Sequence, residues 1–287
     1  MQKLKAMKGF FLLAVSLAAY FGSLVQVRAS QAVNPDNSTA QASTGPAQNM
    51  GHELYLSWGY HTESYLPVEL RLSQPSAGNN FTLHDVDFHD NKGWDQGLFS
   101  HSFTGPQYNF QIGYFFRKNT SFEVNFVHAK AIVTQNQTVR MAGTLNNQPV
   151  DTGVVLSEDV LKYQLNNGAN FALFNIVQRF PLLRNPGQTG SVSVLAKAGI
   201  GFVVPHTDNT VFGVPNEQGF EFSGPDMGLE LAVRLHLYRA FFVELCEKGV
   251  YARYRNLNIN QGRADQELWA RVTSLSFGAS FKIGKKK

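Results

Sequence analysis

Residues 226–238 of this chain read DMGLELAVRLHLY, a run in which apolar and polar side chains alternate. The apolar set consists of Met227, Leu229, Leu231, Val233, Leu235 and Leu237. Successive side chains of a β-strand point to opposite faces of its sheet, so the run predicts a strand with one apolar and one polar face. Residues 107–117 repeat the pattern, with an aromatic or branched side chain at every second position.

Runs of this kind recur along the mature chain and are separated alternately by short and long connections. They predict strands at residues 53–61, 107–117, 121–132, 170–180, 191–204, 226–238, 240–254 and 268–283. In a membrane, strands of this kind are stable only as a closed barrel, because an open sheet edge leaves backbone groups unpaired. The sequence therefore predicts an all-β fold, an eight-stranded antiparallel transmembrane β-barrel over residues 53–284.

The N-terminal segment has the features of an export signal. Lys3, Lys5 and Lys8 precede an apolar stretch, and Val27 and Ala29 supply the small residues of a cleavage site. Residues 1–29 are therefore predicted to be a signal peptide. Residues 30–52 are rich in Gln, Asn, Ser and Ala, which predicts a flexible periplasmic leader. We expect the protein in the bacterial outer membrane, with both termini periplasmic.

The net charge of +4 comes from the predicted signal peptide. Residues 1–29 contain four basic and no acidic residues, so their removal from 25 basic and 21 acidic residues leaves 21 of each. A mature chain without net charge gives no reason to expect a nucleic-acid partner.

The polar faces of the predicted strands carry many charges. In a barrel this narrow, side chains fill the interior, and inward-facing charges are expected to pair with one another. The predicted interior charge network contains Glu123, Arg179, Lys197, Glu230, Arg234, His236, Glu244 and Lys248.

The first long connection contains LHDVDFHD at residues 83–90. If this run is extended, Asp85, Asp87 and His89 share one face, and two carboxylates with an imidazole are suitable ligands for a divalent metal ion. The alternative interpretation is a polar loop in water. Candidate catalytic residues are His84, Asp85, Asp87, His89 and, before a later connection, His206.

The apolar face of the predicted strand 121–132 leads directly to His128 and Lys130. Cationic side chains at the outer edge of the apolar band would meet the phosphorylated sugars of lipid A, so these two residues are the predicted substrate-binding pair. The alternative is that they are ordinary rim residues in water.

Several short motifs resemble, in chain order, the lipid A oxidase-like outer-membrane barrels. They are Gly93-Trp94, Ser102-Phe103, Pro106, Tyr108, His128-Ala129-Lys130, Pro205-His206, Gly224-Pro225, Lys248-Gly249 and Tyr251. The resemblance implies an oxygen-dependent oxidoreductase that oxidises the proximal glucosamine of lipid A in the outer leaflet, with oxygen as co-substrate. In the last predicted strand, Ser276, Gly278, Phe281 and Ile283 resemble the signal by which the barrel assembly machinery recognises its substrates.

Two functions therefore remain open from the sequence. One is a lipid A-modifying enzyme, and the alternative is a non-enzymatic structural or surface-binding barrel of the OmpA/OmpX type. Either protein would contact lipopolysaccharide and is expected to be a monomer. Solute transport is disfavoured because the predicted interior is filled.

Overall fold

The computed structural model describes residues 52–91, 107–165, 168–184, 190–238 and 240–283. The predicted signal peptide, residues 30–51 of the predicted leader and the motifs at residues 93–106 lie outside these ranges. Within them, the only helical element is a 3-10 turn, η1 (Pro75–Ala77). No helix among the described residues has the length and apolar character that a membrane crossing requires.

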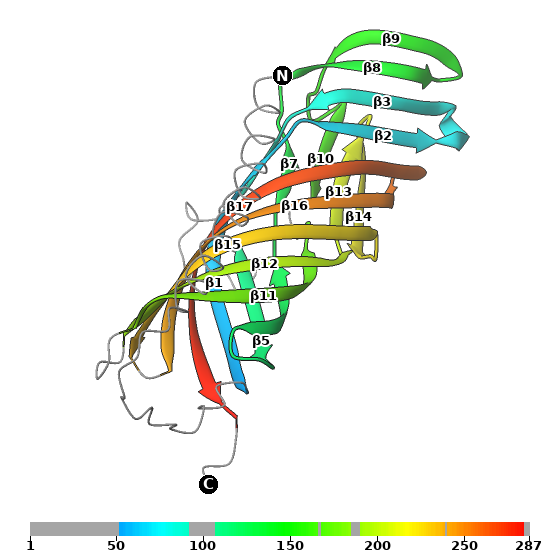
Figure 1. The fold of residues 1–287 in the computed structure, drawn as a ribbon. Coiled ribbons are helices and arrows are strands. Elements are labelled where there is room, and N and C mark those ends of the chain that lie inside the picture. The colour runs from blue at the N-terminus through cyan, green and yellow to red at the C-terminus, as the bar shows by residue number, and fades with distance from the viewer. Residues whose placement is uncertain (1–51, 92–106, 166–167, 185–189, 239, 284–287) are drawn as a thin grey trace, which may run out of the picture. The chain divides into compact units, whose positions relative to one another are not determined.

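A closed ring of antiparallel strands forms the body of the fold (Figure 1). Each strand pairs with the next, and the last pairs with the first from Glu53↔Lys282 to Tyr65↔Ala270. The ring consists of β1 (Glu53–Tyr65), β5 (Tyr108–Phe115), β6 (Thr120–Val127), β11 (Phe171–Arg184), β12 (Ser191–Val203), β15 (Gly224–Tyr238), β16 (Phe241–Ile259) and β17 (Gly262–Lys282). We call the end where β1 begins and β17 ends the proximal end, and the opposite end the distal end.

The barrel wall is apolar outside and polar inside. Outward-facing Leu56, Ile112, Ile176, Leu235 and Leu275 are exposed, whereas their inward-facing neighbours are buried. Aromatic pairs lie on the outer surface toward the distal end, including Trp58 with Tyr60, Tyr108 with Phe126, and Tyr251 with Trp269. An apolar exterior bounded by aromatic residues is the architecture of a transmembrane barrel.

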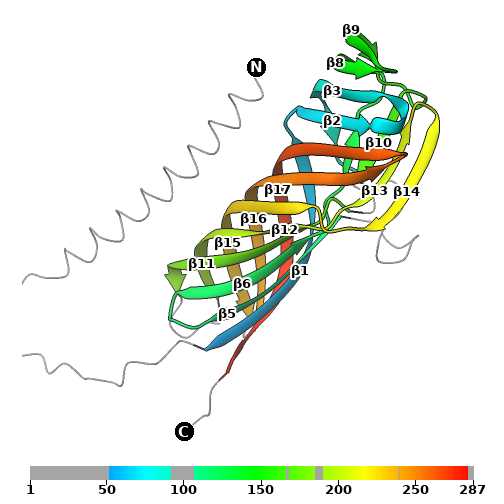
Figure 2. The ribbon, with the colours of Figure 1, turned by 90° about the vertical axis from the view of Figure 1, so that its right-hand side faces the viewer.

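At the distal end the wall continues into two sheets (Figure 2). One extends the barrel sheet beyond β17 through β2 (Val68–Gln74), β3 (Asn79–Val86), β8 (Thr138–Leu145) and β9 (Gln148–Val155). The other has the order β14 (Val214–Phe220), β13 (His206–Val211), β10 (Leu161–Leu165), β7 (Ala131–Val133) and β4 (Phe88–His89). β17 links the barrel and the first extension, because beyond its pairing with β1 it pairs with β2 from Arg263↔Ser73 to Gln266↔Leu70.

The distal sheets share one apolar core. Leu70 and Leu72 of β2 and Leu83 of β3 belong to the same buried cluster as Leu161 and Tyr163 of β10. Both sheets alternate apolar and polar residues, so each has an apolar face that it can bury against the other. The prediction that most of these segments are long connections is wrong, and so is the single strand predicted at residues 121–132, which divides into β6 and β7. Alternation in these segments is short, and the facing sheet makes each strand stable.

Candidate functional site

Alternation along the barrel strands places six charged side chains inside the lumen. Glu123 comes from β6, Lys197 from β12, Glu230 and Arg234 from β15, and Glu244 and Lys248 from β16. All six side chains are at most 2% exposed. Register brings them together, because Lys197 pairs with Glu230, Glu230 with Lys248, and Arg234 with Glu244.

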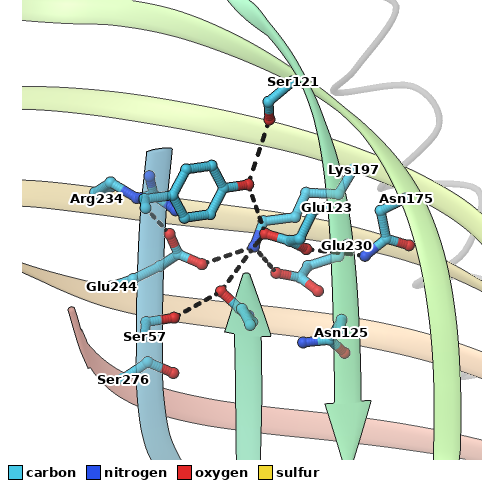
Figure 3. Close-up of polar contacts among 12 residues, drawn as sticks. Ser57, Ser121, Glu123, Asn125, Asn175, Lys197, Glu230, Arg234, Glu244 and Ser276 are labelled. Carbon is cyan, nitrogen blue, oxygen red and sulfur yellow. Dashed lines mark hydrogen bonds and ion pairs between the residues drawn. The ribbon is translucent and has the colours of Figure 1, made fainter. Parts of the chain in front are cut away.

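Lys197 is the centre of this lumen network (Figure 3). Its Nζ lies 3.1 Å from Oε2 of Glu123, 2.7 Å from Oε1 of Glu230 and 2.8 Å from Oε1 of Glu244. It also lies 3.3 Å from Oε1 of Gln111 on β5. One ammonium group therefore joins β5, β6, β12, β15 and β16 across the lumen.

The other two cations complete the charge balance. Nε of Arg234 donates to Oε2 of Glu244 at 2.6 Å, and its guanidinium carbon lies 4.3 Å from the ring centre of Tyr55 and 4.1 Å from that of Phe242. Nζ of Lys248 lies 3.0 Å from Oε2 of Glu230. Three carboxylates thus face three cations, which is the condition under which buried charges are tolerated.

Neutral side chains add hydrogen bonds to Glu123 and Lys248. The Tyr55 hydroxyl donates to Oε2 of Glu123 at 2.8 Å, and Nδ2 of Asn175 donates to Oε1 of the same carboxylate at 2.9 Å. Nζ of Lys248 also donates to Oδ1 of Asn125 at 2.5 Å. The geometry leaves no carboxylate of the three without a cation, although both terminal nitrogens of Arg234 have no hydrogen-bond partner among the described residues.

A second ion pair lies toward the proximal end. Arg179 of β11 contacts Oε2 of Glu53 at 3.0 Å, donates to the Lys118 carbonyl at 2.7 Å and lies over the ring of Phe115 at 3.9 Å. His236 lies 3.5 Å from the hydroxyl oxygens of Ser191 and Ser280, with its ring centre 5.5 Å from that of Phe242. Arg179 and His236 therefore line the lumen apart from the Lys197 centre.

A separate polar cluster lies where the lumen meets the distal core. The carboxylate of Glu63 accepts hydrogen bonds from the Tyr65 hydroxyl, from Nε2 of Gln107 at 3.1 Å and from the backbone nitrogen of Lys130 at 3.1 Å. Its other oxygen lies 3.0 Å from Nε2 of His61, and both side chains are fully buried. We call these residues the Glu63 cluster. Neither ring nitrogen of His61 has a hydrogen-bond partner among the described residues, so the contact with Glu63 is one of proximity. A carboxylate beside an imidazole is a pairing used in acid–base catalysis.

The sequence analysis missed the Glu63 cluster because it ended the first strand at residue 61. His61, Glu63 and Tyr65 continue the inward alternation of Tyr55, and this pattern was the available signal. The cluster also requires Gln107 and Lys130, which the pairing of β1 with β5 and of β5 with β6 brings to the end of β1.

The predicted substrate-binding pair is buried. The side chains of His128 and Lys130 are each 6% exposed, so the prediction that they project from the rim is wrong. Nδ1 of His128 lies 2.9 Å from Oδ1 of Asn170, and its ring stacks on that of Tyr108 with centres 5.0 Å apart. Both residues follow the end of β6, and burial lowers the pKa of each. Their burial keeps both side chains away from a phosphate at the rim.

The predicted metal site is not formed. Asp85 has a φ of 57°, which interrupts the extended run, and the chain then passes from β3 in one sheet to β4 in the other. His84 pairs with Glu69 at 2.5 Å, the backbone of Asp87 is bound by Gln137, and Nδ1 of His89 lies 3.2 Å from the Thr134 hydroxyl. Among the described residues, no group of three His, Cys, Asp or Glu side chains is arranged to hold a metal ion.

His206 is also separated from the other predicted catalytic residues. It begins β13, and its ring lies edge-on to that of Phe220 with centres 5.2 Å apart. His84 is in β3, which belongs to the other distal sheet. The structure therefore does not unite His206 with the residues of the 83–90 run.

Comparisons with known proteins give structural neighbours only. No protein-family model and no curated protein matches the sequence. Among solved structures, OprG of Pseudomonas aeruginosa is 9% identical with a TM-score of 0.39, covering 82% of this chain and 98% of its own. Ail of Yersinia pestis is 11% identical with a TM-score of 0.31, covering 81% and 100%. The outer membrane protease OmpT of Escherichia coli is 8% identical with a TM-score of 0.36, covering 83% and 99%. The barrel architecture rests on the strand pairing and on the two faces of the wall.

Proposed function

We propose that this protein is a sealed barrel of the bacterial outer membrane that does not conduct solutes and acts through its distal sheets at the cell surface. The observation that carries the proposal is the contact of Lys197 with Glu123, Glu230 and Glu244 across the lumen. A path for ions or solutes would require this buried network to open. Breaking one buried charge pair costs about 3–5 kcal/mol, so the closed state is strongly favoured.

The membrane location is supported by the wall. Its outward side chains are apolar and its inward ones are polar, as expected for a barrel that is surrounded by lipid and has a packed interior. Closure of the ring through β1 and β17 leaves the wall without a free edge. In this proposal both termini are periplasmic, the protein is a monomer in contact with lipopolysaccharide, and the barrel assembly machinery inserts it through the signal in β17.

Electrical recording tests the sealed lumen. The full mature protein, inserted in planar lipid bilayers, is expected to give no stable open-channel current, because the lumen network blocks the path. Insertion is checked by the shift between heated and unheated samples on gels, and a porin in the same bilayer is the positive control. A reproducible unitary conductance from the correctly folded protein would contradict the proposal.

Surface labelling tests the orientation. Asn146 and Asn147 form the β8–β9 turn with φ values of 50° and 61°, and a turn of this kind tolerates an inserted tag. We expect an antibody to detect a tag between them on intact cells and to detect a tag after Lys287 only after the outer membrane is permeabilised. Labelling of the C-terminal tag on intact cells would reverse the orientation.

A second candidate function is modification of lipid A, as the sequence resemblance implies. The observation that favours it is the Glu63 cluster, in which a buried carboxylate oxygen lies 3.0 Å from Nε2 of His61. In this proposal His61 moves a proton and Glu63 fixes its orientation, with oxygen as co-substrate of the oxidation. The cluster lies at the distal end of the lumen, the end that faces the outer leaflet in the proposed orientation.

A further inference from the structure

Two aromatic side chains are unusually exposed at the end of β14. Phe220 is 63% exposed, and Phe222, which follows the strand, is 73% exposed. Glu221 between them points to the other side, where its carboxylate accepts hydrogen bonds from the backbone nitrogen of Asn258 at 3.1 Å and from Nδ2 of Asn258 at 2.6 Å. Because Glu221 is held against β16, alternation directs both phenylalanines away from the molecule.

The position of this segment is fixed by the barrel. The backbone nitrogen of Glu221 donates to the Pro205 carbonyl at 3.1 Å, and that of Ser223 donates to the Val203 carbonyl at 3.2 Å. Phe220 and Phe222 therefore lie on a part of the chain that is bonded to the distal end of β12. Both side chains are therefore exposed on a segment whose backbone is held in place.

A continuous row of aromatic rings joins Phe222 to the outer wall of the barrel. Its ring centre lies 5.6 Å from that of Phe202, Phe202 lies 6.1 Å from Phe174, and Phe174 lies 6.3 Å from Phe122. Phe122, Phe174 and Phe202 are outward residues of β6, β11 and β12. The apolar exterior thus extends from the barrel wall to the C-terminal end of β14, next to the outward-facing Asp208 and Glu217 of the β13–β14 hairpin.

The other side of the ring has a different surface. On β16 and β17, the outward positions next to Tyr251 and Trp269 carry the ion pairs Glu247–Arg271 and Arg253–Glu267, the latter at 3.3 Å. Charged residues on the lipid face are tolerated near the interface and are costly in the hydrocarbon. The apolar surface therefore ends closer to the proximal end on β16 and β17 than on β11 and β12.

We propose that Phe220 and Phe222 contact the acyl chains of the outer leaflet, so that the end of β14 nearest the barrel wall lies in the lipid on one side of the barrel. The inference rests on the proposed membrane location. The apolar wall continues to Phe222, so the bilayer that covers Phe174 and Phe202 is also the nearest apolar phase for Phe222. Lipid is therefore the contact that we infer for this side chain. An exposed apolar patch of this kind marks an interaction site, and aromatic side chains are favoured at membrane interfaces.

Spin labelling tests this contact in the full mature chain. Cys246 is the only cysteine and is buried, so a Cys246→Ala background allows one label at a time. Phe222→Cys is compared with Ile176→Cys on the barrel wall and Val155→Cys on β9, where the native residues are 53% and 52% exposed. Each labelled protein is placed in phosphatidylcholine vesicles, and the collision rates of the label with oxygen and with a water-soluble nickel chelate are measured.

We expect the ratio of oxygen to nickel collisions at position 222 to match position 176 and to exceed that at position 155 several-fold. A ratio at 222 equal to that at 155, with 176 in lipid, would overturn the inference and leave the membrane barrel standing. Nickel access at 176 as well would overturn the proposed function itself. An immobilised label at 222 that neither reagent reaches would indicate a protein contact, such as a second copy, and would also overturn the inference. Phe220→Cys provides a second site if the first variant does not show the folded form on gels.

Discussion

Replacing Lys197 with Met is expected to destabilise the folded barrel by about 3–5 kcal/mol, because it leaves a buried carboxylate without its counterion. Glu123, Glu230 and Glu244 all contact the Lys197 ammonium within 3.1 Å, and the two remaining cations cannot balance three carboxylates. Methionine is similar in length, so the change removes charge while leaving most of the volume filled. Urea unfolding in lipid vesicles, followed by tryptophan fluorescence, measures the effect.

Two further variants separate charge from packing. In Lys197→Met combined with Glu123→Gln, the carboxylate that lost its only cation is neutral, and the pairs Arg234–Glu244 and Lys248–Glu230 remain, so part of the lost stability should return. Arg140→Met removes an exposed ion pair, in which Nε of Arg140 lies 2.7 Å from Oδ1 of Asp151, and should have little effect because water screens that pair. Unfolding of Lys197→Met at the same urea concentration as the unchanged protein would contradict the role given to the network.

The barrel strands could be predicted because each one carries a long alternation. The predicted strands 107–117 and 226–238 correspond to β5 (Tyr108–Phe115) and β15 (Gly224–Tyr238). In a wall with lipid on one side and a polar lumen on the other, every second residue must be apolar, so the pattern is visible without knowledge of the partner strand.

The distal sheets could not be predicted in the same way. β7 has three residues and β4 has two, and such segments are strands only because they pair with chain from elsewhere. The pairing of β3 with β8 joins Asn80 to Thr144, and no local pattern encodes a contact over that distance in sequence. The long apolar core that these strands bury is therefore a property of the assembled fold.

The interior residues could also be predicted only in part. Alternation identified Lys197, Glu230 and Arg234 as inward, but only the register between strands determines which charges meet. For the 83–90 run, the prediction of a shared face assumed an extended backbone, and the left-handed conformation of Asp85 removed that assumption. Asp is among the residues that adopt this conformation most readily, although the sequence does not say where.

Replacing Glu63 with Leu should have the second large effect, and the comparison with His61→Ala separates structure from chemistry. The Glu63 carboxylate accepts from the Tyr65 hydroxyl, from Gln107 and from the backbone of Lys130. In Glu63→Leu the Tyr65 hydroxyl can still donate to the Lys130 carbonyl at 2.9 Å, but Gln107 and the Lys130 backbone nitrogen lose their acceptor. Each buried donor left without an acceptor costs about 1–3 kcal/mol, so Glu63→Leu should unfold at a lower urea concentration than the unchanged protein. Glu63→Gln keeps one carbonyl oxygen as an acceptor, so its stability should lie between those of Glu63→Leu and the unchanged protein.

His61→Ala leaves those three hydrogen bonds in place but removes a buried ring, so it should still fold and lose less stability than Glu63→Leu. If the Glu63 cluster modifies lipid A, mass spectrometry of lipid A from cells producing the unchanged protein should show the gain of one oxygen atom, and the His61→Ala cells should lack it. If lipid A has the same mass in cells with and without the gene, the enzymatic function is ruled out and the surface-binding barrel remains. A His61→Ala protein that fails to fold would instead show that the imidazole holds the wall together, because its contact with Glu63 would then be structural.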